Sequence, residues 1–224
     1  VEQVIEDLET VGLKNDRVVL KSDQEPAIVD LMREVQKRRE SEYGTAMDNS
    51  RVGDSNSNGT IESTIKSVEG MIRTLRFALE ARIEGKVRLD HPIVPWLVRH
   101  AAAIITRCWI RPNGRTAYQL IKGRRSNVPM AEFGESVLWL PETWESGRME
   151  KLEPKFEHGV WLGVCPRTDE AIIGTAGGIV RAGTVKRQAI EEAWNAKTLL
   201  SVRDGPWNLG LQSKRHELTV ENDK

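Results

Sequence analysis

The strongest constraint on the fold is a long amphipathic helical pattern between residues 59 and 84. Its apolar residues recur at spacings of three and four, and at about 100° per residue they fall within an arc of roughly 80°. These residues are Ile61, Ile65, Val68, Ile72, Leu75, Leu79 and Ile83. A neighbouring polar stripe carries Glu62, Lys66, Glu69, Arg73 and Arg76. We therefore expect one helix that packs along one face and displays a carboxylate followed by bases on the next.

Helical and strand-like segments alternate before this helix. Residues 1–11 have a helical period that Gly12 ends, and residues 17–21 form a short β-rich run that leads to Asp23. Pro26 opens a second helix in its first turn, and residues 42–47 indicate another short strand. Residues 48–58 are rich in Ser, Asn and Gly and indicate a loop. The pattern predicts an α/β fold.

The pattern changes in the second half of the chain. Residues 92–109 indicate an apolar helix, in which we expect Trp96 and Trp109 to lie in the core, and Ala117–Lys122 a short one. Short alternating runs then follow at residues 136–140, 159–164, 171–175 and 178–185, as in a small antiparallel β module. We therefore expect three parts: residues 1–128, a β-rich module at 129–187, and a charged, poorly ordered tail at 188–224.

The charge is zero overall but unevenly distributed. Residues 1–58 carry 8 basic and 13 acidic side chains, residues 59–128 carry 13 and 5, and residues 129–224 carry 12 and 15. A basic middle third in a neutral chain is what a localised polyanion-binding face would produce. The alternative is an ordinary solvated basic helix surface.

Several classes of site are not indicated by the sequence. Cys108 and Cys165 are too far apart for a metal-ligand spacing, and the four histidines form no zinc motif with them. We find no signal peptide and no apolar run long enough to cross a membrane. The expectation is a reduced intracellular compartment and no membrane partner.

Asp23 and Glu62 are the candidate catalytic pair. Asp23 closes a strand-like run, and Glu62 lies in the first turn of the long helix, with 38 residues between them. A carboxylate at a strand end and another at a helix start can meet in space and hold a divalent metal, the arrangement that phosphoryl transfer on nucleic acids uses. The alternative for Glu62 is an ordinary helix pair with Lys66, one turn later.

The motifs around these carboxylates resemble the integrase region of Ty1/copia-type retrotransposon polyproteins, in the retroviral integrase superfamily with an RNase H-like core. Lys21-Ser22-Asp23 is similar to the strand end with the second catalytic Asp, and Asn58-Gly59-Thr60-Ile61-Glu62 to the family's N-G-x-x-E. Further similar segments are Pro95-Trp96-Leu97, Asn113-Gly114-Arg115-Thr116-Ala117-Tyr118-Gln119-Leu120 with Gly123-Arg124, Phe133-Gly134 and Gly159-Val160-Trp161-Leu162-Gly163. The resemblance covers roughly residues 1–187.

The resemblance implies a polynucleotidyl transferase that performs 3′-end processing and DNA strand transfer. Asp23 and Glu62 would be catalytic and would bind Mg²⁺ (or Mn²⁺), which activates the nucleophile and stabilises the leaving oxygen. Lys66, Arg73 and Arg76 would contact the phosphates of DNA, both the ends of the element and the target. Relatives act as multimers in the nucleus, which implies self-association and a nuclear location during integration.

The chain departs from the family pattern at its start. The first catalytic Asp and the opening strands of the RNase H-like core have no counterpart before Asp23, because Asp7 and Asp16 fall in other elements. The resemblance therefore implies a truncated RNase H-like core, a mixed sheet with helices whose first strands are missing, followed by the small antiparallel β module. We expect a polyprotein fragment whose parent catalyses while this chain alone does not. Whether the chain is an enzyme thus stays open.

Two other interpretations also stay open. The chain could be a non-catalytic nucleic-acid-binding module that uses the basic residues 59–128, and it would then be indifferent to loss of the Asp23 and Glu62 charges. It could also be the product of a decayed element, although the intact periodicity up to Ile83 argues against extensive decay.

Overall fold

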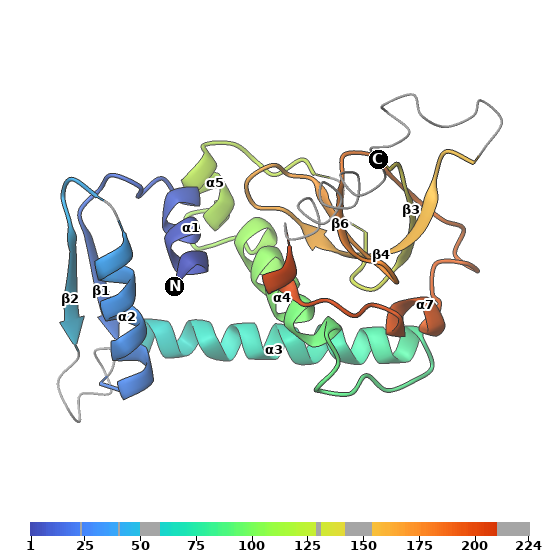
Figure 1. Ribbon diagram of the computed structural model, residues 1–224, viewed down its shortest axis with the longest axis horizontal. Helices are drawn as coiled ribbons and strands as arrows, with labels where there is room; N and C mark the ends of the chain where they lie inside the picture. The colour runs from blue at the N-terminus through green and yellow to red at the C-terminus, as the bar shows by residue number, and fades with distance from the viewer. Residues whose placement is uncertain (23, 40, 50–58, 129–130, 142–153, 210–224) are drawn as a thin grey trace, which may run out of the picture. The chain divides into compact units, whose positions relative to one another are not determined.

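A computed structural model describes the chain over residues 1–22, 24–39, 41–49, 59–128, 131–141 and 154–209 (Figure 1). Its internal contacts divide it into two units. The first unit comprises residues 1–69 and 110–125, and the second comprises residues 70–109 and those from 126 onward. The fold combines helices with β-sheets in each unit, so the expected α/β class is confirmed.

The first unit is built around a parallel pair of strands. Strand β1 (Val18–Ser22) is followed by helix α2 (Pro26–Arg38) and strand β2 (Thr45–Asn49), and the two strands pair in parallel from Val18 opposite Thr45 to Ser22 opposite Asn49. A parallel pair requires a crossover connection, which α2 provides. Helix α1 (Glu2–Thr10) precedes this β-α-β unit.

Arg39 connects the loop after α1 to the start of β2. Its side chain donates to three backbone carbonyl oxygens between Leu13 and Asp16, and to Oγ1 of Thr45 at 2.8 Å. Only 7% of Arg39 is exposed. A guanidinium has five N–H donors, so one side chain can satisfy several carbonyls that the loop leaves without helix or sheet partners.

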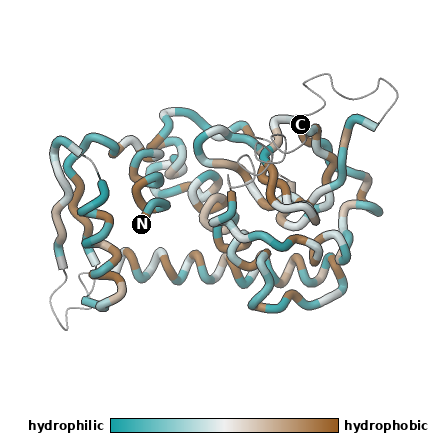
Figure 2. The backbone as a smooth tube through the Cα atoms, viewed as in Figure 1, coloured by the Kyte–Doolittle hydropathy of each residue, from teal (hydrophilic) through white to brown (hydrophobic). Residues whose placement is uncertain are grey.

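Helix α3 (Gly59–Arg82) begins in the first unit and ends in the second. Apolar and polar residues alternate along it (Figure 2). Toward its end Leu79 is buried, and Ile72, Leu75 and Ile83 pack against the core of the second unit. Near its start, however, Ile61 is 45% and Ile65 52% exposed. The expected packing face is therefore buried only where the second unit supplies a core to cover it.

The second unit contains a five-stranded antiparallel sheet, whose strand order is β6-β5-β4-β3-β7. The strands are β3 (Ser136–Trp139), β4 (Glu157–Val164), β5 (Ala171–Thr175), β6 (Gly178–Ala182) and β7 (Val185–Arg187). Consecutive strands β4, β5 and β6 are neighbours, and β7 returns to pair with β3. The antiparallel module expected from the short alternating runs is thus confirmed.

The two faces of this sheet belong to separate apolar clusters. One cluster joins the sheet to helix α4 (Ile93–Cys108), in which Trp96 and Leu97 are fully buried, and to Leu79 of α3. The other contains Val137, Trp161 and Ile173. Trp96 thus lies in the core as expected, whereas Trp109 is 51% exposed because α4 ends at the preceding residue.

Residues 188–209 differ from the expectation of a poorly ordered tail. They contain helix α7 (Ala196–Leu200), which Asn195 caps through its side chain, and the short helix η2 (Pro206–Asn208). Leu199 and Val202 are buried in the core of the second unit, and Trp96 Nε1 donates to the carbonyl of Asp204 at 2.7 Å. Residues 188–209 are ordered because their apolar side chains pack in the same core cluster as α4.

Candidate metal- and nucleic-acid-binding residues

The predicted carboxylate pair lies in part outside the described residues. Asp23 belongs to the residues that the structure does not describe, whereas β1 is described up to Ser22, the residue directly before it. Glu62 lies in the first turn of α3 and is exposed. The distance between the two carboxylates is therefore not part of the structure, and their pairing stays a prediction.

The carboxyl ends of β1 and β2 lie beside each other. β1 and β2 run in parallel and finish in register, with Ser22 opposite Asn49. In open α/β sheets, ligands bind outside the carboxyl ends of parallel strands. The edge also carries Asp48, which is exposed and lies opposite Lys21.

Asp48 is a candidate that sequence reasoning missed. The pattern of residues 42–47 predicted a strand that stopped short of this residue, and only the observed register places Asp48 beside the end of β1. Among the described residues, no three His, Cys, Asp or Glu side chains gather in a group that could hold a metal ion.

The predicted DNA-binding residues have unequal surroundings. Lys66 and Arg73 are exposed. Arg76 is only one-third exposed, and its guanidinium donates to Glu80 Oε1 at 3.0 Å and to the carbonyl of Val87 at 2.8 Å. These contacts connect the end of α3 to the loop that follows it, so the Arg76 guanidinium is already engaged within the second unit.

Glu80 is the acceptor at the centre of this arrangement. Lys86 Nζ donates to its carboxylate at 2.7 Å, and the backbone N–H of Val87 donates at 3.2 Å. The hydrogen bond from Lys86, opposed by partial burial and aided by Val87 and Arg76, lowers the pKa of Glu80 below its ordinary value. Glu80 therefore stays ionised and serves the structure of the α3 end.

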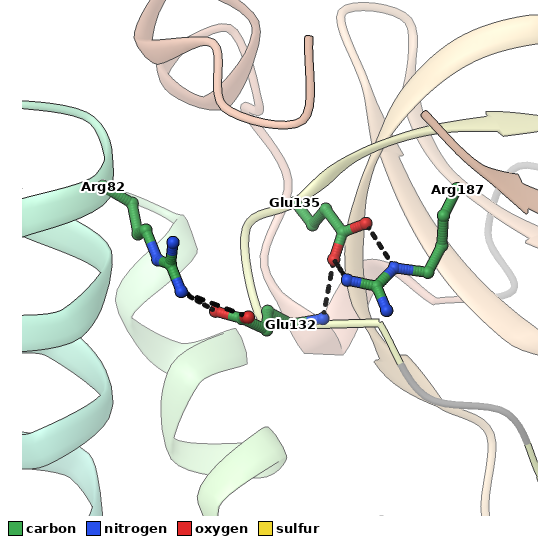
Figure 3. A network of polar contacts seen from close by, with 4 residues as sticks. All are labelled: Arg82, Glu132, Glu135 and Arg187. Carbon is green, nitrogen blue, oxygen red and sulfur yellow. Dashed lines mark hydrogen bonds and ion pairs between the residues drawn. The ribbon is translucent and has the colours of Figure 1, made fainter. Parts of the chain in front are cut away.

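A second buried carboxylate, Glu135, lies in the loop that enters β3 (Figure 3). Arg187 on β7 donates to both of its oxygens, at 2.7 and 3.0 Å, and the backbone N–H of Glu132 donates at 3.0 Å. Arg82 in turn contacts the Glu132 carboxylate at 3.4 Å. Both carboxylate oxygens of Glu135 thus accept from donors within the protein, which favours a structural role for Glu135 over general acid–base chemistry.

His100 is the buried histidine of the second unit. It is 3% exposed, its ring lies 5.3 Å from that of Phe133, and within the described part of the chain its Nδ1 has no hydrogen-bond partner. Burial lowers the pKa of His100 to about 4. A cavity of about 290 Å³ lies beside it, lined mainly by apolar residues such as Leu75, Leu79 and Trp194. His100 is therefore neutral at neutral pH.

Basic residues that sequence reasoning did not single out gather in the first unit. Residues 110–125 contain Arg111, Arg115, Lys122, Arg124 and Arg125, all exposed, and no acidic residue. A count of charge over this shorter window, rather than over residues 59–128, would have found them.

No protein-family model matches this chain, and no curated protein matches it. Over the part of the chain that is described, none of the helices has the length and apolar character needed to cross a bilayer.

Proposed function

We propose that this chain is part of a retrotransposon integrase of the Ty1/copia type, with a truncated RNase H-like catalytic core. In the parent polyprotein it would take part in Mg²⁺-dependent 3′-end processing and DNA strand transfer. Residues 1–224 on their own would bind DNA without joining it, because among the described residues before Asp23 the candidates Asp7 and Asp16 lie on no strand.

One observation carries this proposal. In the first unit, β1, α2 and β2 form a β-α-β arrangement in which β1 ends at Ser22, directly before Asp23 in the sequence and opposite Asn49 of β2. Glu62 lies in the first turn of a long helix that begins in the same unit. The residues before β1 form helix α1 and a loop, so Asp7 and Asp16 lie on no strand that could present a further carboxylate. This supports the assignment of the core and explains why neither Asp7 nor Asp16 is proposed as a further metal ligand.

The residues suit a magnesium or manganese ion by their chemistry. Asp23 and Glu62 would hold it, since hard divalent cations prefer carboxylate oxygens. When bound, the ion would supply Lewis acidity at a phosphodiester. The exposed Glu62 carboxylate is accessible to such a ligand, and Lys66, one helical turn later, would contact a phosphate.

Paramagnetic broadening by Mn²⁺ tests the proposed pair. We expect Mn²⁺ to broaden the amide resonances of residues 20–22 and of the first turn of α3 together, and Asp23→Asn or Glu62→Gln to abolish both effects. Glu69→Gln, on the same helix, is the matched control. Broadening at only one of the two places, or broadening that survives both substitutions, would refute a shared ion.

A joining assay tests the expected lack of catalysis. The chain is incubated with labelled DNA ends and Mg²⁺ or Mn²⁺, and we expect binding without nicking or strand transfer. Metal-dependent joining that Glu62→Gln abolishes would show that the chain has a complete site and would contradict this part of the proposal.

The second candidate is a non-catalytic nucleic-acid-binding module. It is favoured by residues 110–125, which contain five basic residues and no acidic one. A module of this kind would bind DNA equally well, or slightly better, after Asp23→Asn with Glu62→Gln, and would show no shared Mn²⁺ site. If the integrase proposal holds, the protein would also self-associate on DNA and would be nuclear during integration.

A further inference from the structure

We infer that residues 111–125, which we call the basic segment, form a preorganised surface that contacts the phosphate backbone of double-stranded nucleic acid. This inference rests on the proposed nucleic-acid-binding function and assigns it to a segment other than the α3 stripe. The segment supplies five of the 13 basic residues between 59 and 128 but none of the five acidic ones.

The charge of the basic segment contrasts with the rest of its unit. Residues 1–69 carry 9 basic and 15 acidic side chains. A polyanion would therefore be repelled by most of the unit and attracted at this segment. Such a distribution favours binding at the basic segment over weak contacts spread across the surface of the unit.

The backbone of the basic segment is held in one conformation at its start. The N–H of Arg111 donates to the carbonyl of Arg115 at 2.9 Å, and the N–H of Gly114 donates back to Arg111 at 2.8 Å. Asn113 Oδ1 accepts from the N–H of Arg115 at 3.1 Å, and Gly114 adopts a φ of +74°. Arg111 and Arg115 are thus placed side by side by a closed turn.

The following helix is capped at both ends. Thr116 and Gln119 form a reciprocal capping box at the start of α5 (Ala117–Lys122), and Gly123 ends it in the left-handed conformation. Tyr118 is buried, and Lys122 Nζ donates to the carbonyl of Thr10 at the end of α1. An ordered surface loses little conformational entropy when it binds, which favours affinity.

The chemistry of the basic segment fits phosphate. Four of its five bases are arginines, whose planar guanidinium matches phosphate oxygens bidentately. The six-residue helix α5, about 9 Å long, separates Arg111 and Arg115 from Arg124 and Arg125. Bases therefore stand at both ends of a short, fixed spacer, and a phosphate chain that spans α5 can contact both ends of the segment.

Fluorescence anisotropy with a labelled DNA duplex at several salt concentrations tests this inference. We expect Arg111→Gln with Arg115→Gln to weaken binding by about 10-fold and to lower the slope of log affinity against log salt by about 2. Arg125→Gln should lower the slope by about 1. The control is Arg33→Gln with Lys37→Gln, which removes two exposed charges from α2 in the same unit and should leave both quantities unchanged.

The outcomes separate this inference from the proposed function. Wild-type binding that the Arg111 and Arg115 substitutions do not weaken would overturn the inference and leave the proposed function standing. A wild-type protein that binds no duplex at low salt would overturn both. Tighter binding of poly-glutamate than of duplex, lost in the same variants, would identify the basic segment as a docking surface for acidic proteins and would overturn the assignment to nucleic acid.

Discussion

The guanidinium of Arg187 on β7 donates hydrogen bonds to both carboxylate oxygens of Glu135. The Glu135 side chain is 1% exposed, whereas that of Arg187 is 60% exposed. The pair connects the last strand of the sheet to the loop that enters β3 (Figure 3). The hydrogen bond to Glu135 and its charge raise the pKa of Arg187 above its usual value. Because Glu135 is buried and Arg187 is largely exposed, replacing Arg187 tests how much this pair contributes to the stability of the second unit.

Arg187→Leu is expected to lower the free energy of unfolding by about 1–2 kcal/mol, because the Glu135 carboxylate stays buried with one backbone donor. The estimate is below that for a fully buried pair, since water partly screens the arginine. Urea denaturation followed by tryptophan fluorescence measures the change. Lys197→Gln, an exposed charge on α7, is the control, and equal midpoints for the two variants would contradict the role of the pair.

His100 predicts a pH dependence of stability. Its pKa in the folded protein is about 4, compared with 6.5 for the ordinary group, so the unfolded state binds more protons between these pH values. The free energy of unfolding should therefore fall as the pH is lowered through this range, by about 2 kcal/mol between pH 7 and pH 5.

His100→Leu should remove this contribution, because the variant has no group at this position to protonate. The measurement is urea denaturation of both proteins at several pH values, and the readout is the difference in their slopes against pH. Titration of the carboxylates is common to both proteins and cancels in that difference. A slope that His100→Leu leaves unaltered would show that the imidazole is not buried as a neutral group.

Gly134 has a packing role in the Phe133-Gly134 motif. A Cβ at this position would lie 2.5 Å from Leu79 Cδ1 and 3.1 Å from Leu199 Cδ1, and the residue has a φ of +85°. Gly134→Ala should destabilise the protein by about 2–4 kcal/mol through backbone strain and overpacking. Gly183→Ala, where a Cβ meets nothing within 4 Å, should change the thermal midpoint little; similar midpoints for both variants would argue against close packing at Gly134.

Arg39 is expected to hold the first unit together. Arg39→Met removes the donors for the carbonyls of residues 13–16 and should raise the hydrogen-exchange rates of peptides that cover β1 and β2, corresponding to about 2–3 kcal/mol of lost local stability. Arg38→Gln, which removes an exposed pair with Glu34, should leave those rates nearly unchanged. If the peptides of β1 and β2 stay protected from hydrogen exchange in Arg39→Met, the strand pair alone would account for the local stability of this unit.

Local patterns determined much of the secondary structure. The spacing of apolar residues located α3, the sequence bounded the short helix α5 at Ala117–Lys122, and the short alternating runs located β3, β4, β5 and β6. These signals arise within one or two turns of helix or one strand, and a sequence records such short-range preferences directly. The carboxylate of Glu62 in the first turn of α3 was predictable for the same reason.

Tertiary structure decided what depends on distant neighbours. It exposes Ile61 and Ile65 although they share a face with the buried Leu79, and it engages Arg76 with the carbonyl of Val87. It also brings Asp48 beside the end of β1 and folds Leu199 into the core of the second unit. Burial, register and ion pairing depend on which residues meet across the fold, and side chains that look equivalent along one helix acquire different roles when only part of that helix is covered.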